Sequence, residues 1–194
     1  MARAGLIHYQ FEAIHPFLDG NGRVGRLLVI LLLIEWGLIS RLLLYLSAFF
    51  EAHRLDYYDR LLAVSQRGDW KNWLLFFLKG ISSQSLDAIT RIEHLGRLRA
   101  AYRERLRAER AAERLLQTLD VLFESPILNI RQLEAALDVP YRTAQRYVER
   151  LEEHGILREV TGQARNRPYR ADEILRNLES NEDHGRAISD QSPL

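Results

Sequence analysis

The chain has 194 residues, of which 47% are hydrophobic and 27% are charged, and this globular composition excludes a wholly disordered or fibrous protein. It contains no cysteine, which excludes a disulfide framework, a zinc finger and a cysteine nucleophile. The formal net charge of +1 excludes a strong overall attraction to nucleic acid or membrane.

The basic residues are almost all arginine: only Lys71 and Lys79 among the 27 are lysines. Arginine suits bidentate contacts with phosphate and carboxylate groups, although a GC-rich genome produces the same bias. The N-terminus lacks the pattern of a signal peptide, and the longest apolar run, Leu27 to Ile34, is too short to span a bilayer. We therefore expect a cytoplasmic protein with no membrane partner.

Residues 1–82 are predicted to form an apolar, aromatic-rich helical domain. A first helix from Ala2 to Ile14 ends before Pro16, and a second runs from about Arg23 to Trp36, with Gly37 at its C-terminal end. The second helix is apolar nearly all round, which predicts a central position. Further helices are expected from Ser47 to Gln66 and after Asp69, with Gly68 between them. The expected apolar faces are Leu6, Ile7, Phe11 and Ile14 in the first helix, and Trp70, Trp73, Leu74, Phe77 and Leu78 in the last.

Residues 83–124 are predicted to form one long connecting helix, with or without a break. The piece from Arg103 to Arg114 holds many charges and few apolar side chains. We therefore expect it to lie outside any core, as a solvated strut or a connector that faces a partner.

Residues 125–172 are predicted to form a small winged helix-turn-helix domain. Asn129 is expected to cap a short helix, and a second helix from Tyr141 to His154 ends at Gly155. Two strands, Ile156 to Val160 and Arg167 to Ala171, then form a hairpin, which completes the expected order. Residues 173–194 are expected to begin as a helix and end as a disordered polar tail. The inward residues of the two helices are predicted to be Ile130, Leu133, Ala136 and Leu137, and Ala144, Val148 and Leu151.

The segment from His15 to Arg26, HPFLDGNGRVGR, carries the strongest chemical signal. Gly20, Asn21 and Gly22 tolerate positive φ and can arrange successive backbone N–H groups around an anion. The apolar helix begins directly afterwards, so the positive end of its dipole faces the same place. Arg23 and Arg26 are neighbours on its first turn and can each hold a phosphate oxygen. Together with Val24 and Gly25 between them, these residues predict a cradle for a di- or triphosphate.

Two further side chains complete a set for displacement at phosphorus. A lone carboxylate beside phosphates, here Asp19, is a suitable Mg²⁺ ligand. Histidine titrates near neutral pH, so His15 is a candidate base for an attacking hydroxyl. A histidine or a Gly-x-Gly alone is commonly structural, but the twelve residues together indicate in-line phosphoryl chemistry.

This segment resembles the Fic (Fic/Doc) family signature, His-Pro-Phe-x-Asp-Gly-Asn-Gly-Arg-x-x-Arg, at every specified position. The lead-in from Gln10 to Ile14 is also similar to the family. Later stretches resemble bacterial Fic proteins that carry C-terminal winged helices, so the resemblance extends to about Ala171. These stretches are Tyr45 to Phe50, Asp56 to Leu61, and Gly68 to Trp70.

The resemblance implies a protein adenylyltransferase, which moves AMP from Mg-ATP to a Ser, Thr or Tyr hydroxyl of a target protein. It implies that His15 is the catalytic base and that Asp19 holds Mg²⁺ on the phosphates. The pair Tyr57 and Tyr58 aligns with residues that line the adenosine pocket, and ordinary helix packing is the alternative for this pair. Phosphate binding is implied for Gly20, Asn21, Gly22, Arg23, Val24, Gly25 and Arg26.

The signature begins only 14 residues after Met1. Members of the family carry a helical segment before it, including a β-hairpin flap that docks the target strand beside the histidine. We therefore expect an N-terminally truncated Fic core in residues 1–82, a partial Fic helical bundle.

The C-terminal domain has features of a DNA-binding module. Arg142, Arg146 and Arg150 form a basic stripe on the expected recognition helix, and Arg165 and Arg167 lie at the hairpin tip. Against this, eight arginines face seven acidic residues over 125–172, which is nearly neutral for a DNA binder. Docking of a protein or formation of a homodimer is the alternative.

Three other functions stay open at this stage. The first is a DNA-binding transcriptional regulator with a Fic remnant that senses nucleotide. The second is removal of AMP, which requires a glutamate to position water, and none is evident. The third is transfer of phosphate or phosphocholine, which relatives in the family carry out at the same site.

Overall fold

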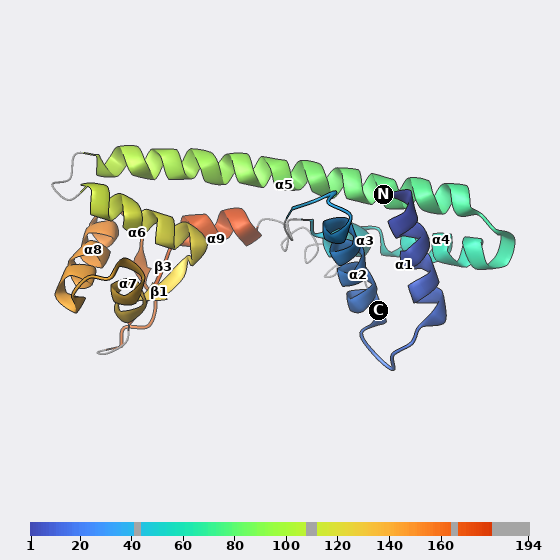
Figure 1. Ribbon diagram of the computed structural model, residues 1–194, viewed down its shortest axis with the longest axis horizontal. Helices are drawn as coiled ribbons and strands as arrows, with labels where there is room; N and C mark the ends of the chain where they lie inside the picture. Colours follow the sequence, from blue (N-terminus) through green and yellow to red (C-terminus); the bar gives the residue numbers. More distant parts are fainter. Residues whose placement is uncertain (41–43, 108–111, 164–166, 180–194) are drawn as a thin grey trace, which may run out of the picture. The chain divides into compact units, whose positions relative to one another are not determined.

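The computed structural model describes residues 1–40, 44–107, 112–163 and 167–179 (Figure 1). The described chain is mainly helical, with a small three-stranded antiparallel sheet towards its C-terminal end, and this confirms the predicted fold class. Its contacts divide it into two compact units, one of residues 1–90 and one that begins at residue 91.

The described residues of the first unit form four helices and the beginning of a fifth. The expected helix from Ser47 to Gln66 is two helices, because His53 leaves the helical conformation at φ −119° and ψ 36°. Gly68, at φ 68°, ends the second of them as predicted. The expected start of a new helix near Ser83 is wrong, since the preceding helix continues to Leu106. The elements are α1 (Ala2–Ile14), α2 (Asn21–Glu35), α3 (Leu46–Ala52), α4 (Arg54–Arg67) and α5 (Trp70–Leu106).

The buried face of α1 differs from the predicted one. Leu6 and Ile14 are exposed, at 42% and 63%, whereas small and aromatic side chains form the contact. The indole Nε1 of Trp73 donates a 2.9 Å hydrogen bond to the carbonyl of Gly5, and a Cβ at Gly5 would lie 2.9 Å from the Phe77 ring. The large rings of α5 lie so close to α1 that only small residues of α1 fit at this contact. The buried residues of α1 are Ala4, Gly5, His8 and Tyr9.

Helix α2 is half-buried rather than central. Its buried side includes Val29, Ile30 and Leu33, but Leu27 and Leu31 are half exposed, at 52% and 50%. The prediction of a central helix, which was based on its uniformly apolar sequence, therefore overestimates how much of α2 is buried.

An aromatic core holds the first unit together. Trp73 and Phe77 of α5 are fully buried, as predicted, and Phe76 joins them, whereas Trp70 is 39% exposed. These rings pack against side chains from α2, α3 and α4. The other aromatic members of the cluster are Tyr9, Phe49, Phe50 and Tyr57.

The second unit contains the predicted helix–turn–helix followed by a two-stranded hairpin. A strand that the sequence did not predict, β1, pairs with β3, so the strand order is β1-β3-β2 with Leu128 opposite Tyr169. The hairpin strands are shorter than predicted. Besides the end of α5, the elements are α6 (Ala112–Glu124), β1 (Ile127–Asn129), α7 (Ile130–Leu137), α8 (Tyr141–Glu153), β2 (Arg158–Glu159), β3 (Pro168–Arg170) and α9 (Asp172–Glu179).

The predicted cap of α7 is confirmed. Asn129 accepts a hydrogen bond from the backbone of Gln132, whose side chain accepts one from the backbone of Asn129, and these two bonds form a capping box. The predicted inward residues Ala144, Val148 and Leu151 of α8 are buried, but Ala136 of α7 is exposed.

The charged end of α5 contradicts one expectation. Tyr102 and Leu106 are fully buried in the core of the second unit, although the sequence around Leu106 is rich in charge. One buried apolar residue per turn is enough to anchor this piece, while its arginines stay at the surface. The expected disordered tail lies outside the described residues from 180 onward. Within the described part, no helix is long and apolar enough to span a bilayer.

Gly25 allows α1 and α2 to approach closely, and Gly25→Ala tests this contact. A Cβ at this position would overlap Oε1 of Glu12 and lie 3.1 Å from the Phe11 ring. We expect a loss of about 1–3 kcal/mol in the free energy of unfolding, because the side chains must shift to admit it. All three tryptophans (Trp36, Trp70 and Trp73) lie in the first unit, so denaturant unfolding followed by tryptophan fluorescence measures its stability.

Gly96→Ala is the matched control. Gly96 lies in α5 within the second unit, with no atom near the position of an added Cβ. The tryptophan-detected midpoint should not fall in this variant. An equally stable Gly25→Ala variant would contradict the close packing of α1 on α2.

Candidate active site

The turn between α1 and α2 carries the signature segment, and the side chain of Asn21 holds it in shape. The Phe17 N–H donates to Oδ1 of Asn21 at 2.9 Å, and Nδ2 of Asn21 donates to the Phe17 carbonyl at 2.6 Å. Asn21 is only 2% exposed. The sequence analysis assigned the backbone N–H of Asn21 to anion binding, and the two bonds of the side chain do not use that N–H.

The N-terminus of α2 is open for such a ligand. The first hydrogen bond of the helix runs from the Val24 N–H to the Gly20 carbonyl at 3.0 Å, so the N–H groups of Asn21, Gly22 and Arg23 have no acceptor within the helix. Gly20 is the N-cap at φ 81°, a conformation that favours glycine, and its position supplies no capping side chain. The predicted nest of backbone donors is therefore compatible with the observed backbone.

The two arginines of the segment lie close to these glycines. A Cβ at Gly20 would lie 3.4 Å from the Arg23 guanidinium, and one at Gly22 would lie 3.0 Å from that of Arg26. Arg26 donates from Nε to Oγ of Ser47 at 2.8 Å, which fixes its position. Ser47 was not predicted as a site residue, because no sequence spacing links it to a side chain 21 positions earlier.

Arg26 and Arg23 also border a cavity of about 280 Å³. Its other walls come from α2 and from the chain around the start of α3. The lining residues are Arg23, Arg26, Leu27, Ile30, Leu44, Tyr45, Leu46 and Ser47.

His15 and Asp19 flank the turn on its solvent side. His15 ends α1 in the left-handed conformation, at φ 50° and ψ 58°, and is exposed. Asp19, whose side chain is 92% exposed, accepts a hydrogen bond of 3.3 Å from Arg23. Both side chains are thus accessible to a ligand on the open N-terminus of α2.

Asp19 is the residue that would hold Mg²⁺. Within the described ranges, no three or more His, Cys, Asp or Glu side chains gather in a group that could hold a metal ion. A single exposed carboxylate suits Mg²⁺ when substrate phosphates and water supply the remaining ligands. The residues therefore fit a metal that arrives with a polyphosphate.

A buried polar layer lies beneath the turn, where His8, Glu12 and Tyr57 meet. His8 is fully buried, its Nε2 is 3.0 Å from the Tyr57 hydroxyl, and burial lowers its pKa to about 4. Burial also raises the pKa of Glu12, although the positive charge of Arg26 opposes this shift. The Oε1 atom of Glu12 has no hydrogen-bond partner among the described residues.

The tyrosine pair is divided between core and surface. Tyr57 is 4% exposed and packs among Phe50 and Trp73, whereas Tyr58 is 55% exposed with the Arg54 guanidinium over its ring. Neither residue lines the cavity beside Arg23 and Arg26. Tyr57 is thus packed in the core, as the alternative states, and the adenosine-pocket assignment of the pair stays a prediction.

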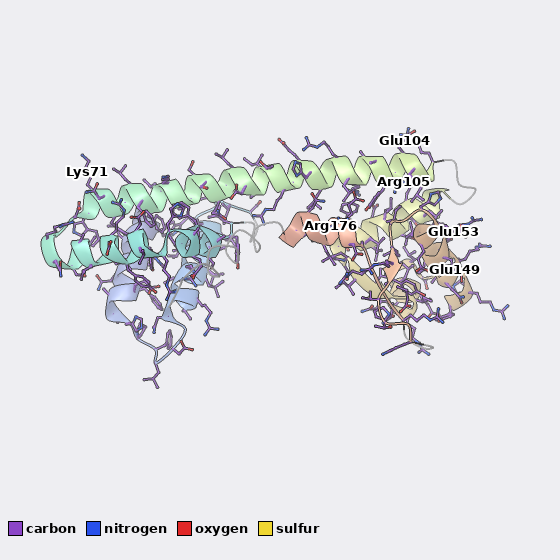
Figure 2. All side chains as sticks on the ribbon, turned by 180° about the vertical axis from the view of Figure 1, so that it is seen from behind. Lys71, Glu104, Arg105, Glu149, Glu153 and Arg176 are labelled. Atoms are coloured by element: carbon purple, nitrogen blue, oxygen red, sulfur yellow. The ribbon has the colours of Figure 1, made fainter. Side chains whose placement is uncertain are left out.

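The arginines expected to contact DNA differ in their surroundings. Arg142 and Arg146 are exposed on α8. Arg150 pairs with Glu153 at 2.7 Å, and Glu149 lies on the same helix (Figure 2). Arg167 donates to the Gln163 carbonyl at 2.7 Å. Arg165 lies outside the described residues.

Comparisons with known proteins support the resemblance of the signature segment. The model of the Fic/DOC family matches residues 1–33. Over 35 residues, 18% of this chain and 11% of the relative, the sequence is 57% identical to a probable protein adenylyltransferase of Aquifex aeolicus. Over 73 residues it is 38% identical to the protein adenylyltransferases Fic of Aedes aegypti and Culex quinquefasciatus, covering 38% of this chain and 13% of each relative. The chain therefore spans only a small part of the curated relatives it matches.

The buried imidazole of His8 should make the first unit sensitive to acid. Its pKa of about 4 lies below the usual value of 6.5, so the unfolded chain binds the proton more readily between these values. The contribution of neutral His8 to the free energy of unfolding is complete above pH 6.5. It is lost as the pH falls towards 4, and the loss is at most about 3 kcal/mol. Tryptophan-detected unfolding at a series of pH values measures this loss.

His8→Gln should flatten the dependence on pH, whereas His94→Gln, at an exposed position of α5, should leave it unchanged. The raised pKa of Glu12 acts in the opposite direction, because it favours stability at low pH. The test is therefore the comparison of the variants with wild type, and not the slope of the free energy of unfolding against pH in wild type alone. The same slope in His8→Gln and wild type would contradict a buried neutral imidazole.

Proposed function

We propose that the first unit is a nucleotidyltransferase site that moves AMP from Mg-ATP to a hydroxyl group of a target protein. The observation that carries the proposal is the open N-terminus of α2, with Arg23 and Arg26 beside it and an exposed His15 on the preceding turn. The match of residues 1–33 to the Fic/DOC family and the names of the relatives as protein adenylyltransferases support it.

The polyphosphate is held by backbone and arginine together. The free N–H groups of Asn21, Gly22 and Arg23 point out of the helix end, where the helix dipole favours negative charge. Arg26 is already oriented by Ser47, so little conformational freedom is lost when it contacts a phosphate. Arg23 exchanges its exposed contact with Asp19 for a phosphate oxygen, which frees the carboxylate for the metal.

His15 serves as the base in the chemical step. Its imidazole accepts the proton of the target hydroxyl while the hydroxyl oxygen forms a bond to the α-phosphorus. The bond from that phosphorus to the bridging oxygen breaks, and pyrophosphate leaves. Mg²⁺ held by Asp19 would neutralise charge on the phosphates. In this proposal residues 1–82 are the Fic core, residues 83–124 the connecting helix and residues 125–172 the winged helix.

His15→Ala should reduce transfer by about 10²–10⁴-fold and leave Mg-ATP binding unchanged, because the base acts only in the chemical step. The assay follows label from α-labelled ATP into protein, in a lysate or on the chain itself. Label from γ-labelled ATP should not be incorporated, which separates AMP transfer from phosphate transfer. His94→Ala, at an exposed position of α5, is the control. Undiminished transfer by His15→Ala would refute the assignment.

Arg23→Ala should instead weaken Mg-ATP binding by about tenfold in calorimetry, through loss of a charge-assisted contact. Arg67→Ala, which removes an exposed arginine at the end of α4, should bind as wild type does. Equal affinities of Arg23→Ala and wild type would contradict the phosphate cradle.

A second function, DNA binding by the second unit, is favoured by one observation. Arg142 and Arg146 are exposed in the N-terminal half of α8, the second helix of the helix–turn–helix, and neither forms an ion pair with another described residue. This is the part of such a helix that contacts base edges and phosphates in the major groove.

Binding of duplex DNA should weaken steeply as salt rises, and fluorescence anisotropy measures it. Replacing both arginines with alanine should reduce the slope of log affinity against log salt by about 1–2. Arg131→Ala, on the preceding helix α7, is the control. Absence of binding at low salt would favour the protein-docking alternative.

A further inference from the structure

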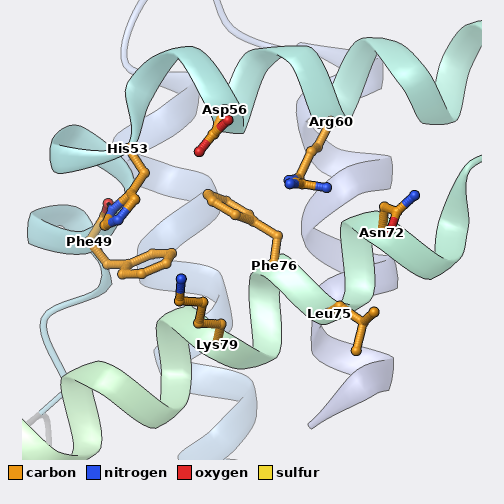
Figure 3. Close-up of a pocket in the computed structure, with 8 residues that line it drawn as sticks. All are labelled: Phe49, His53, Asp56, Arg60, Asn72, Leu75, Phe76 and Lys79. Atoms are coloured by element: carbon orange, nitrogen blue, oxygen red, sulfur yellow. Dashed lines mark hydrogen bonds between the residues drawn. The ribbon is translucent and has the colours of Figure 1, made fainter.

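We propose that a second pocket of the first unit binds a small anion that carries a phosphate or carboxylate group. The pocket lies between α3, α4 and the beginning of α5 and has a volume of about 260 Å³ (Figure 3). It shares no lining residue with the cavity beside Arg23 and Arg26. The lining residues are Phe49, His53, Asp56, Arg60, Asn72, Leu75, Phe76 and Lys79.

Two basic side chains converge on this pocket from different helices. Arg60 comes from α4 and Lys79 from α5, and the amine of Lys79 points into the space between the two elements (Figure 3). The Nε atom of Arg60 is buried and has no hydrogen-bond partner among the described residues. A buried cationic donor without a partner is costly, and an anion in the pocket would satisfy it.

The aromatic floor keeps the Arg60 guanidinium in place. Its Cζ atom lies 5.5 Å from the centre of the Phe76 ring, and Phe76 is only 7% exposed. A planar guanidinium held over an aromatic ring can still offer N–H donors to a carboxylate or phosphate group. Phe49, 4% exposed, forms the other buried wall and offers an apolar surface to the rest of the ligand.

The remaining polar groups of the pocket bear on the charge of the ligand. His53 donates from Nδ1 to the Phe49 carbonyl at 2.9 Å, so only Nε2 of its ring is available to a ligand. Asn72 is engaged with Asp69 through Nδ2, at 2.8 and 3.0 Å from the two carboxylate oxygens. Asp56 lines the pocket and opposes an anion, and Asp69, which holds Asn72 without lining the pocket, also interacts electrostatically with Arg60. Arg60 and Lys79 are the two cations that line the pocket itself. The volume is below the usual range for drug-sized ligands, which indicates a small molecule.

The chain contains only two lysines, and this allows a local test. Lys79 lines the pocket, whereas Lys71 lies in the first turns of the same helix and does not line it (Figure 2). The protein is treated with an amine-acetylating reagent, with and without inorganic phosphate at constant ionic strength, and both lysines are quantified by mass spectrometry. Phosphate should protect Lys79 several-fold and leave Lys71 unchanged. Equal protection of both lysines, or protection of neither, would overturn the proposal.

Three variants test whether the ligand of this pocket is negatively charged and whether it binds at this place. Asp56→Asn should strengthen the protection of Lys79 by phosphate about threefold to fivefold, because it removes the opposing charge from an exposed position. Arg60→Gln should weaken it by a similar factor. Arg23→Ala, which removes the candidate phosphate contact at the α2 end, should leave it unchanged. Weaker protection in Asp56→Asn, or loss of protection in Arg23→Ala, would contradict an anion site at this place.

Discussion

The pair of hydrogen bonds between Asn21 and the backbone of Phe17 determines the geometry of the candidate active site. A carboxamide offers a donor and an acceptor side by side, so one side chain satisfies both the N–H and the carbonyl of the same residue. The turn is thereby closed from within, and no side chain caps α2. The N–H groups at the start of the helix remain available to an anion, with Arg23 beside Gly20 and Arg26 beside Gly22.

This turn is supported by a layer that connects it to the aromatic core. Gly25 brings α2 close to α1, and His8, below this contact, reaches the hydroxyl of Tyr57 on α4. The ring of His8 also stacks against Phe50, with 5.6 Å between ring centres. A neutral imidazole suits this environment because burial penalises its charged form. The same core that stabilises the first unit thus also holds in place the helices on which the signature segment lies.

Local signals in the sequence predicted local structure well, whereas contacts between distant positions escaped them. The bounds of α1, the cap at Asn129 and the end of α4 at Gly68 each depend on a few neighbouring residues, and all were predicted correctly. The grouping of the arginines near the glycine turn follows from helical spacing in the same way. By contrast, the bond from Arg26 to Ser47 and the strand β1 depend on tertiary contacts that no periodicity reveals. For Tyr57 the sequence offered both pocket lining and helix packing, and the choice between them likewise depends on tertiary contacts.

The central claim is that the N-terminus of α2 binds a polyphosphate through its backbone. Titration of the isotope-labelled protein with Mg-ATP, followed by amide chemical shifts, tests this claim most directly. The account predicts that the amides of Gly20, Asn21, Gly22 and Arg23 shift first and saturate together. Saturating shifts elsewhere in the chain, with these four amides unmoved, would contradict it.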